Sequence, residues 1–232
     1  MVSKNILRAF TKPGSTFFDI GAHVGDVTKE YHKLGYKVHA FEGASTNSIT
    51  FKENLKDLSD ITLHEVALSD AEKICKTRFN DCIGDEHPEI EVHFVEFDKY
   101  YSENSLPKPD FIKMDIEGME TVVCKKMSNL IKNIRPIFHI EIHNDKKFKN
   151  FRYSDYPSFV SLEEGGFDFK EFQNMGYNSY MFKYGLLKPV THFRRHAQYF
   201  FIPKEKDINM PLLRRYFLGF RDYFIYKYRY AF

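Results

Sequence analysis

The sequence predicts an α/β fold, in which a mostly parallel sheet carries helices on both faces. Short runs of apolar, β-branched and aromatic residues alternate with helix-like stretches along most of the chain. Acidic residues directly follow several of these runs, and in an open parallel sheet ligands bind beyond the carboxyl ends of the strands. With 232 residues, 43% of them hydrophobic, the chain is long enough for one such domain with a sizeable core.

The first strand leads into a glycine-rich turn. The apolar run 16–20 predicts a buried strand that stops at Gly21, and a helix is expected over 27–34 with Asp26 as its cap. A strand that leads through a tight turn into a helix directs the free backbone N–H groups of the turn and the helix start towards one point. Gly21 permits a positive φ, and Gly25 permits another molecule to approach the backbone closely.

The next strand, expected over 37–41, is followed directly by Glu42. An acidic residue about 20 residues beyond a glycine turn is placed to hydrogen-bond ribose hydroxyls. The spacing D-x-G-x-x-x-G, however, lacks the pyrophosphate glycines of a dinucleotide site, and Asp19 at the strand end favours a cationic ligand group. S-adenosylmethionine (SAM), a nucleoside cofactor with an amino-acid end, fits this pattern. The alternative is an ordinary strand–turn–helix corner.

The alternation continues towards the C-terminus. A helix capped by Ser45 or Thr46 should turn Ile49, Leu55 and Leu58 towards the sheet. Further along, the chain should leave the sheet at Ala67-Leu68, where an adenine ring would lie. The further strands are expected over 61–66, 74–79, 90–97, 111–114, 137–142, 167–172 and 199–202. The further helices are expected over 117–126 and 157–164, with a loop over 176–187.

Composition excludes several classes of protein. The 34 basic and 32 acidic residues give a net charge of +2, which argues neither for nucleic acid nor for an acidic partner, so no nucleic acid is expected as a partner. The three cysteines have no metal-like spacing, so a reducing, cytoplasmic location is expected. No apolar run reaches the length of about 18 residues that a membrane-spanning helix needs.

The last part of the chain differs from the rest. We expect a catalytic domain over 1–205 and a basic, aromatic helical appendage over 206–232. Within 211–232 apolar residues recur at helical spacing, so this stretch should pack on its own domain or on a second copy, giving a homodimer. A basic amphipathic helix lying on a membrane is the alternative.

Ionisable residues gather after two of the expected strands. Asp115 and Glu117 follow 111–114, and Glu141 and His143 lie at the end of 137–142. Glu141 interrupts an apolar run, where a carboxylate is costly to bury unless it is paired or coordinating. Either acidic residue after 111–114 can instead simply cap the next helix.

Six stretches together resemble one family. They are F-F-D-I-G-A-H-V-G (17–25), H-A-F-E-G (39–43), E-V-A-L-S-D (65–70), D-F-I-K-M-D-I-E-G-M-E (110–120), P-I-F-H-I-E-I-H (136–143) and Y-F-F-I-P (199–203). Their order and spacing over residues 14–203 resemble the FkbM family of SAM-dependent methyltransferases. K-M-D-I-E-G-M-E is the most specific piece, because that family carries K-x-D-x-E-G-x-E there.

The resemblance implies a Rossmann-like class I methyltransferase fold with a seven-stranded sheet whose last strand is antiparallel. It implies methyl transfer, usually to a hydroxyl oxygen of a sugar, a glycan or a secondary metabolite. By position, it assigns the methionine end of SAM to Asp19, Gly21 and Gly25, the ribose to Glu42, the adenine to Ala67 and Leu68, and the methyl-transfer side to Asp115. The chain departs from the family at two cofactor-site positions, with His23 for the usual Asn and Gly43 for a frequent Pro.

Methyl transfer to oxygen needs the acceptor about 3 Å from the methyl carbon and its proton removed. The candidates for this chemistry are Asp115, Glu117, Glu141 and His143. His143 is the expected base, or Mg²⁺ held by Asp115 and Glu141 activates the hydroxyl. Two further alternatives are a nicotinamide-dependent oxidoreductase, disfavoured by the glycine spacing, and a SAM-binding module without catalysis.

Overall fold

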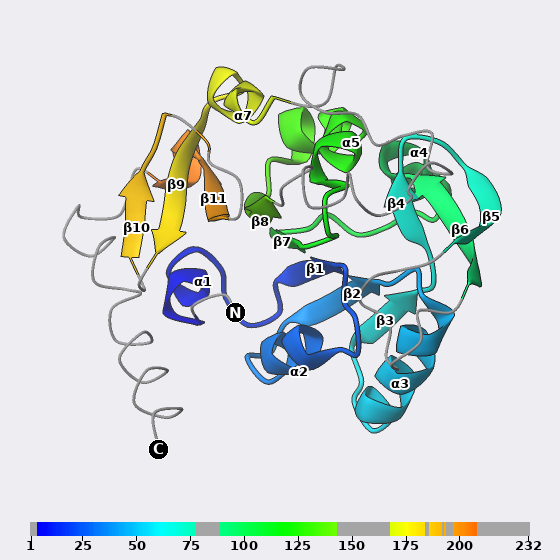
Figure 1. The fold of residues 1–232 in the computed structure, drawn as a ribbon. Helices are drawn as coiled ribbons and strands as arrows, with labels where there is room; N and C mark the ends of the chain where they lie inside the picture. The colour runs from blue at the N-terminus through cyan, green and yellow to red at the C-terminus, as the bar shows by residue number, and fades with distance from the viewer. Residues whose placement is uncertain are drawn as a thin grey trace.

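A computed structural model of the chain describes residues 4–77, 89–142, 168–183, 186–191, 193 and 197–207. Its centre is an eight-stranded sheet in the order β10-β9-β11-β8-β7-β1-β2-β3 (Figure 1). The strands of this sheet are β1 (Thr16–Ile20), β2 (Lys37–Phe41), β3 (Ile61–His64), β7 (Phe111–Met114), β8 (Ile137–Ile142), β9 (Tyr177–Lys183), β10 (Leu186–Pro189) and β11 (Ala197–Pro203). The predicted α/β class is confirmed.

Five neighbouring strands of this sheet run parallel, namely β3, β2, β1, β7 and β8. Strand β11 lies between β8 and β9 and is antiparallel to both. Seven of the strands therefore follow the arrangement that the resemblance implies. The eighth, β10, pairs antiparallel with β9 along the outer edge. Central strands such as β1 and β8 are buried on both faces, which explains their near-continuous apolar sequences.

Helices cover both faces of the sheet, as Figure 1 shows. One face carries α1 (Lys4–Phe10), α2 (Asp26–His32) and α3 (Ser45–Leu55), and the other carries α4 (Phe97–Glu103), α5 (Glu120–Lys125) and α7 (Lys170–Asn174). Neighbouring residues of each strand face opposite layers: Phe17 packs with α1 and α2, and Phe18 packs with the other core cluster. A π-helical turn, η1 (Leu130–Ile134), and α8 (Lys204–Asp207) complete the helical elements of the described part.

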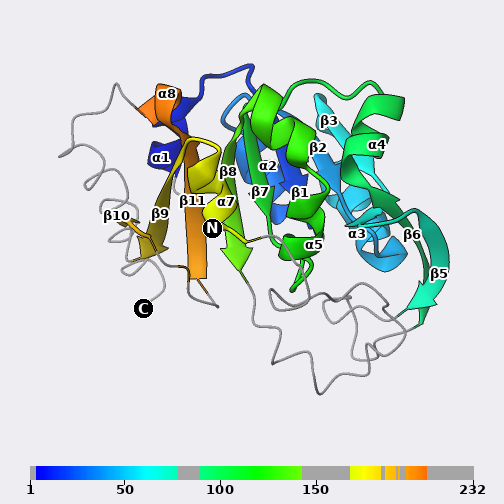
Figure 2. The same ribbon diagram turned by 90° about the horizontal axis from the view of Figure 1, so that it is seen from above.

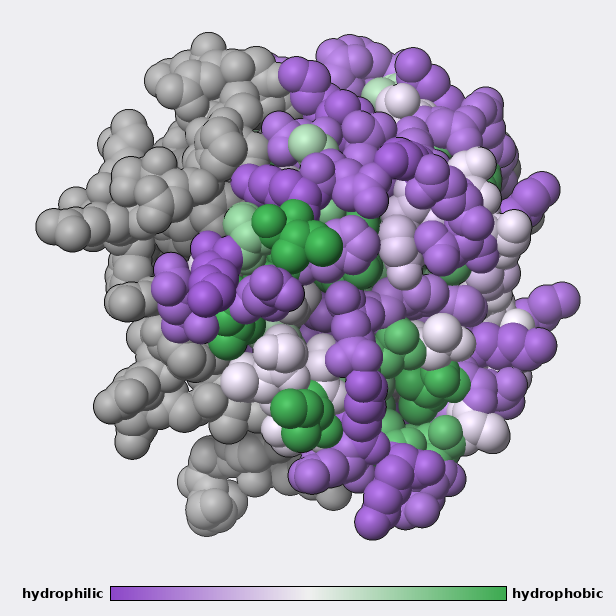
Figure 3. Space-filling model, turned by 90° about the vertical axis from the view of Figure 1, so that its right-hand side faces the viewer, coloured by the Kyte–Doolittle hydropathy of each residue, from purple (hydrophilic) through white to green (hydrophobic). Residues whose placement is uncertain are grey.

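A second sheet lies beside β3, on the opposite side of the molecule from β10, as Figures 1 and 2 both show. Its strands are β4 (Ala67–Ser69), β5 (Lys73–Thr77) and β6 (Ile90–Glu96), in the order β4-β6-β5. β5 pairs antiparallel with β6, which confirms the strands expected over 74–79 and 90–97 as far as the structure describes them. Figure 3 looks onto this side of the molecule, where hydrophilic residues cover most of the surface and hydrophobic ones form separate patches.

Several expectations for individual elements were wrong. The predicted strand over 167–172 ends in helix α7, because Phe169 and Phe172 lie three residues apart and both enter the same core cluster. The predicted loop over 176–187 instead contains β9 and the first half of β10, since β11 supplies β9 with a hydrogen-bonding partner that local sequence does not reveal. Ile49 is 60% exposed and points away from the core, unlike Leu55.

Helix boundaries also differ. The N-cap of α2 is Gly25 rather than Asp26, and the N-cap of α3 is Ala44, without a side-chain cap from Ser45 or Thr46. The predicted helix over 157–164, the residue His143 and nearly all of the 206–232 appendage lie outside the described residues, so the proposed packing of the appendage stays a prediction. Among the residues that the structure does describe, no helix is both long enough and apolar enough to cross a membrane.

Candidate cofactor site and active site

The candidate site lies at the carboxyl ends of β1, β2 and β7, where three loops contact one another. The backbone N–H groups of Gly21 and Ala22 both donate to the Phe41 carbonyl at 3.0 Å, which joins the end of β1 to the end of β2. On the other side, the N–H of Asp115 donates to the Ile20 carbonyl at 3.1 Å. The glycine turn is therefore fixed between its two neighbours before any ligand binds.

Gly21 has no room for a side chain. Its φ is +76°, as the sequence predicted, and a β-carbon there would lie 1.9 Å from the carbonyl oxygen of Asp115. Gly25 is also in a left-handed conformation, with φ +89°, but a β-carbon there would meet Leu55 and Phe51 of α3 at 2.7 and 2.9 Å. The space beside the α-carbon of Gly25 is thus filled by the protein's own helix α3, and the expected contact of Gly25 with the cofactor stays a prediction.

Asp19 lies beneath the turn with no exposed surface. The Thr28 hydroxyl donates to its Oδ2 at 2.7 Å, and the ammonium of Lys113 lies 3.4 Å from its Oδ1. Burial raises the pKa of the Asp19 carboxyl, and Lys113 and Thr28 act in the opposite direction. The cation expected beside Asp19 is therefore provided by the chain, and Asp19 can influence a cofactor only through the turn above it.

Lys113 was not among the residues predicted for the site. It lies in the buried strand β7, directly opposite Asp19 in register, and is itself only 7% exposed. Its ammonium donates to the Gly21 carbonyl at 2.6 Å. The available signal was a lysine inside an apolar strand, since a charge there needs a partner.

Glu42 follows β2 and is almost buried. Its Oε2 accepts a hydrogen bond from the N–H of His23 at 2.8 Å, and its Oε1 accepts from the N–H of Ala44 at 2.9 Å. His23 itself has a φ of 51°, in the left-handed region. The carboxylate thus holds the glycine turn and the start of α3, and carboxylate oxygens retain lone pairs for further donors.

The neighbouring residues place the predicted adenine position next to Glu42. A β-carbon on Gly43 would lie 2.6 Å from that of Ala67, so the glycine allows the end of β2 to approach β4. Ala67 is partly exposed, whereas Leu68 is buried in the core.

The stretch after β7 forms a tight turn. Asp115 is partly exposed, Glu117 is exposed with a φ of 56°, and Gly118 has a φ of 110°. The buried carboxylate of Glu120 accepts from the N–H groups of Ile116 and Gly118 at 3.3 and 3.1 Å, which stabilises the turn. Helix α5 starts at Glu120 rather than at 117, and Glu120 is a second residue that the prediction missed.

The comparisons with known proteins agree with this geometry. The model of the methyltransferase FkbM domain family matches residues 19–178, which include the glycine turn, Glu42 and the Asp115 turn. The chain belongs to the FkbM methyltransferase family. No curated protein gives a significant match to the sequence.

The chain is also similar to several solved structures, of which the first named here supports the fold. A methyltransferase FkbM from Methylobacillus flagellatus is 16% identical with a TM-score of 0.52, over 82% of this chain and 44% of that one. A precorrin-6y C5,15-methyltransferase from Geobacter metallireducens is 13% identical with a TM-score of 0.45, over 84% and 82% of the two chains. Fibrillarin from Aeropyrum pernix, solved with bound S-adenosyl-L-methionine, is 13% identical with a TM-score of 0.46, over 82% and 67%. This chain thus spans less than half of its FkbM structural relative.

In this FkbM domain the carboxylate of Glu141 is paired. The amide of Gln198 on β11 donates to Glu141 Oε2 at 2.8 Å, which explains how a carboxylate is tolerated within the apolar strand β8. Met114 pairs with Ile140 in register, so Asp115 and Glu141 each follow paired positions on neighbouring strands. Within the described ranges no three histidine, cysteine, aspartate or glutamate residues are grouped to hold a metal ion, so the predicted magnesium site gains no support.

A buried histidine on β8 continues the row of polar residues that Asp19 on β1 and Lys113 on β7 form under the site. His139 lies opposite Lys113 in register, and its ring packs 4.6 Å from that of Phe200. Among the described residues neither ring nitrogen makes a hydrogen bond of normal geometry, although the Gln198 side chain lies near the ring. Burial, aided by the nearby Lys113 charge, lowers the pKa of His139 to about 3, so the ring is neutral near pH 7.

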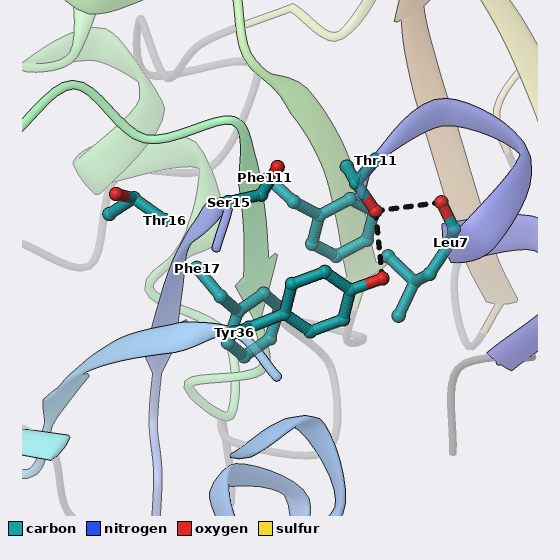
Figure 4. A pocket seen from close by; sticks show the side chains of 7 residues that line it. All are labelled: Leu7, Thr11, Ser15, Thr16, Phe17, Tyr36 and Phe111. Atoms are coloured by element: carbon teal, nitrogen blue, oxygen red, sulfur yellow. Dashed lines mark hydrogen bonds between the residues drawn. The ribbon is translucent and has the colours of Figure 1, made fainter. Parts of the chain in front are cut away.

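A small crevice lies at the other end of the parallel strands, away from the candidate site (Figure 4). It is lined by Leu7, Thr11, Ser15, Thr16, Phe17, Tyr36 and Phe111, at the amino ends of β1 and β7. The Thr11 hydroxyl bonds to the Leu7 carbonyl and to the Tyr36 hydroxyl at 2.7 and 2.9 Å. The crevice is too narrow for a water molecule, so it is a packing feature rather than a ligand site.

Proposed function

We propose that this chain is a SAM-dependent methyltransferase that methylates a hydroxyl oxygen, most simply that of a sugar or glycan. The observation that carries the proposal is the joining of the Gly21 turn to Glu42 on one side and to the Asp115 turn on the other. Membership of the FkbM family supports methyl transfer. Cofactor, acceptor and position of transfer are our proposals.

The residues present fit SAM better than a dinucleotide. The turn between β1 and α2 has left-handed residues at Gly21, His23 and Gly25, but not the glycine spacing that holds a pyrophosphate. We assign the amino-acid end of SAM to the backbone of the Gly21–His23 turn. We assign the ribose hydroxyls to Glu42, whose position at the end of β2 is that of a ribose acceptor.

We assign the remaining parts of the cofactor to residues at the ends of the neighbouring strands. The adenine would lie beside Ala67, with Leu68 packed behind it, and the methyl group would face the side closed by Asp115. Bound SAM supplies an electrophilic methyl group on a cationic sulfur. The chain's own task is then to orient the acceptor hydroxyl and remove its proton.

We assign proton removal to the ionisable residues after β7 and β8. Asp115 and Glu141 lie at neighbouring strand ends, Glu117 is exposed on the turn, and His143 follows the last described residue of β8. His143 is our preferred base because the unperturbed pKa of histidine lies near neutral pH. Glu141, held by Gln198, is placed to orient the acceptor.

Calorimetry tests the cofactor assignment. The chain should bind S-adenosylhomocysteine, the product of methyl transfer, and should not bind NAD⁺. Replacing Glu42 with Ala should weaken binding by about 1.5–3 kcal/mol, the value of hydrogen bonds that involve a charged group. Glu103→Ala, an exposed carboxylate on α4, is the control. Binding of NAD⁺ without S-adenosylhomocysteine would favour the oxidoreductase alternative.

A methyl-transfer screen over glycans and small hydroxylated molecules tests the reaction. Once an acceptor is found, His143→Ala should lower the rate about 10²–10⁴-fold with nearly unchanged cofactor affinity. Loss of turnover with EDTA and recovery with Mg²⁺ would instead restore the metal role of Asp115 and Glu141. Cofactor binding with no turnover on any acceptor would favour a binding module.

A further inference from the structure

Among the described residues of the candidate site, Lys113 is the one buried cation, and it contacts the glycine turn directly. Its ammonium lies 2.6 Å from the Gly21 carbonyl oxygen and 3.4 Å from Asp19 Oδ1. Both flanking residues of β7, Ile112 and Met114, are fully buried, so the strand holds the lysine backbone rigidly. The ammonium therefore has a fixed position under the turn.

The two contacts of Lys113 do different things. The ion pair compensates the charge of Asp19, which has no access to water. The hydrogen bond to the Gly21 carbonyl instead fixes one peptide of the turn, at a glycine whose α-carbon already lies close to the Asp115 carbonyl. The first contact concerns the free energy of folding, and the second concerns the geometry of the turn.

We propose that Lys113 is a positioning residue for the cofactor, setting its affinity through the Gly21 peptide without touching the ligand. The inference rests on the proposed function, since it concerns the same site. A cofactor held by backbone groups of a turn needs those groups fixed in advance, because ordering them on binding reduces affinity. Lys113 is the side chain that fixes Gly21 from below, as Glu42 fixes His23 from the side.

The decisive variant is the double substitution Asp19→Asn with Lys113→Met. Lys113→Met alone leaves a buried carboxylate without its cation and can fail to fold. The double variant removes both charges, so its fold should survive, but the Gly21 carbonyl still lacks its donor. Asp19→Asn alone keeps that donor. Lys126→Met, which breaks a partly exposed ion pair with Glu96 of 3.0 Å, is the matched lysine control.

The measurements are the dissociation constant for S-adenosylhomocysteine and the melting temperature without ligand. In the double variant the constant should rise about 10- to 100-fold, the value of one charged hydrogen bond, with the melting curve still cooperative. Lys126→Met should change the constant less than about threefold, which is below 1 kcal/mol, and Asp19→Asn should raise it less than the double variant does. An unchanged constant in the folded double variant would overturn the inference.

Two further outcomes are decisive. If Asp19→Asn weakens binding as much as the double variant does, the effect passes through Asp19 and the role of the Gly21 bond is refuted. If the double variant does not fold, Asp19→Asn with Lys113→Leu replaces it, because that variant also removes both charges and the donor to Gly21; unchanged affinity in it also refutes the inference. A wild-type chain that does not bind S-adenosylhomocysteine refutes the proposed function itself.

Discussion

The glycine turn can be probed by one added methyl group. Gly21 and Gly14 have similar backbone conformations, with φ of +76° and +86°. A β-carbon on Gly14 would meet no atom within 4 Å, whereas one on Gly21 would lie 1.9 Å from the carbonyl oxygen of Asp115. Substituting each glycine with alanine therefore separates the cost of the conformation from the cost of the collision.

The expected costs follow from these geometries. A left-handed conformation costs a non-glycine residue about 1–2 kcal/mol, so Gly14→Ala should lower the free energy of unfolding by that amount. Gly21→Ala carries the same strain and also forces the backbone after β7 to move, and overpacking of this kind adds about 1–3 kcal/mol. The total for Gly21→Ala is about 2–5 kcal/mol, or very roughly 5–15 °C in melting temperature for a chain of this size.

Urea unfolding of both variants, followed by circular dichroism, gives the two free energies. Gly21→Ala should also bind S-adenosylhomocysteine more weakly, because the turn and the Asp115 loop separate, whereas Gly14→Ala should bind like the wild type. Equal destabilisation by the two substitutions would refute the view that Gly21 is required by its contact with Asp115. The left-handed conformation alone would then explain why a glycine is needed at position 21.

Three further predictions concern the core, the buried histidine and the ribose position. Phe172→Ala should cost about 3–5 kcal/mol in urea unfolding, because the ring is fully buried and stacks 4.1 Å from Phe201; Ile49→Ala, at an exposed position, should stay within about 0.5 kcal/mol. The pKa of His139 is lowered from 6.5 to about 3 in the folded protein, so the unfolded chain takes up a proton at a higher pH than the folded protein does. The stability that comes from this difference is complete above pH 6.5 and is lost as the pH falls towards 3. Between pH 7.5 and pH 5, His139→Phe should therefore lose about 2 kcal/mol less unfolding free energy than the wild type, and equal losses would contradict this assignment. Glu42→Gln keeps the acceptor for His23 but removes the charge, so S-adenosylhomocysteine should bind more tightly than to Glu42→Ala and more weakly than to the wild type.

Much of the site could be predicted from local sequence. The alternation of apolar runs and helical stretches, the glycine at the end of β1 and the acidic residue after β2 are each encoded within a few residues. Backbone conformation at Gly21 depends on sterics between adjacent peptides, so a sequence pattern is enough to predict it. The same holds for the buried central strands, whose apolar residues need no partner to be recognised.

What only the tertiary structure decided depends on contacts between distant residues. Lys113 and Gly21 are 92 positions apart in the sequence, and their contact exists because β1 and β7 pair in one register. A shift of that register by one residue would turn Lys113 to the opposite face, away from Asp19. Likewise Gly25 has no room for a side chain because α3 packs against it, and β9 and β10 are strands because β11 pairs with β9 and β9 pairs with β10. Each of these features depends on residues that are distant in the sequence but close in space. A local sequence pattern does not contain that information.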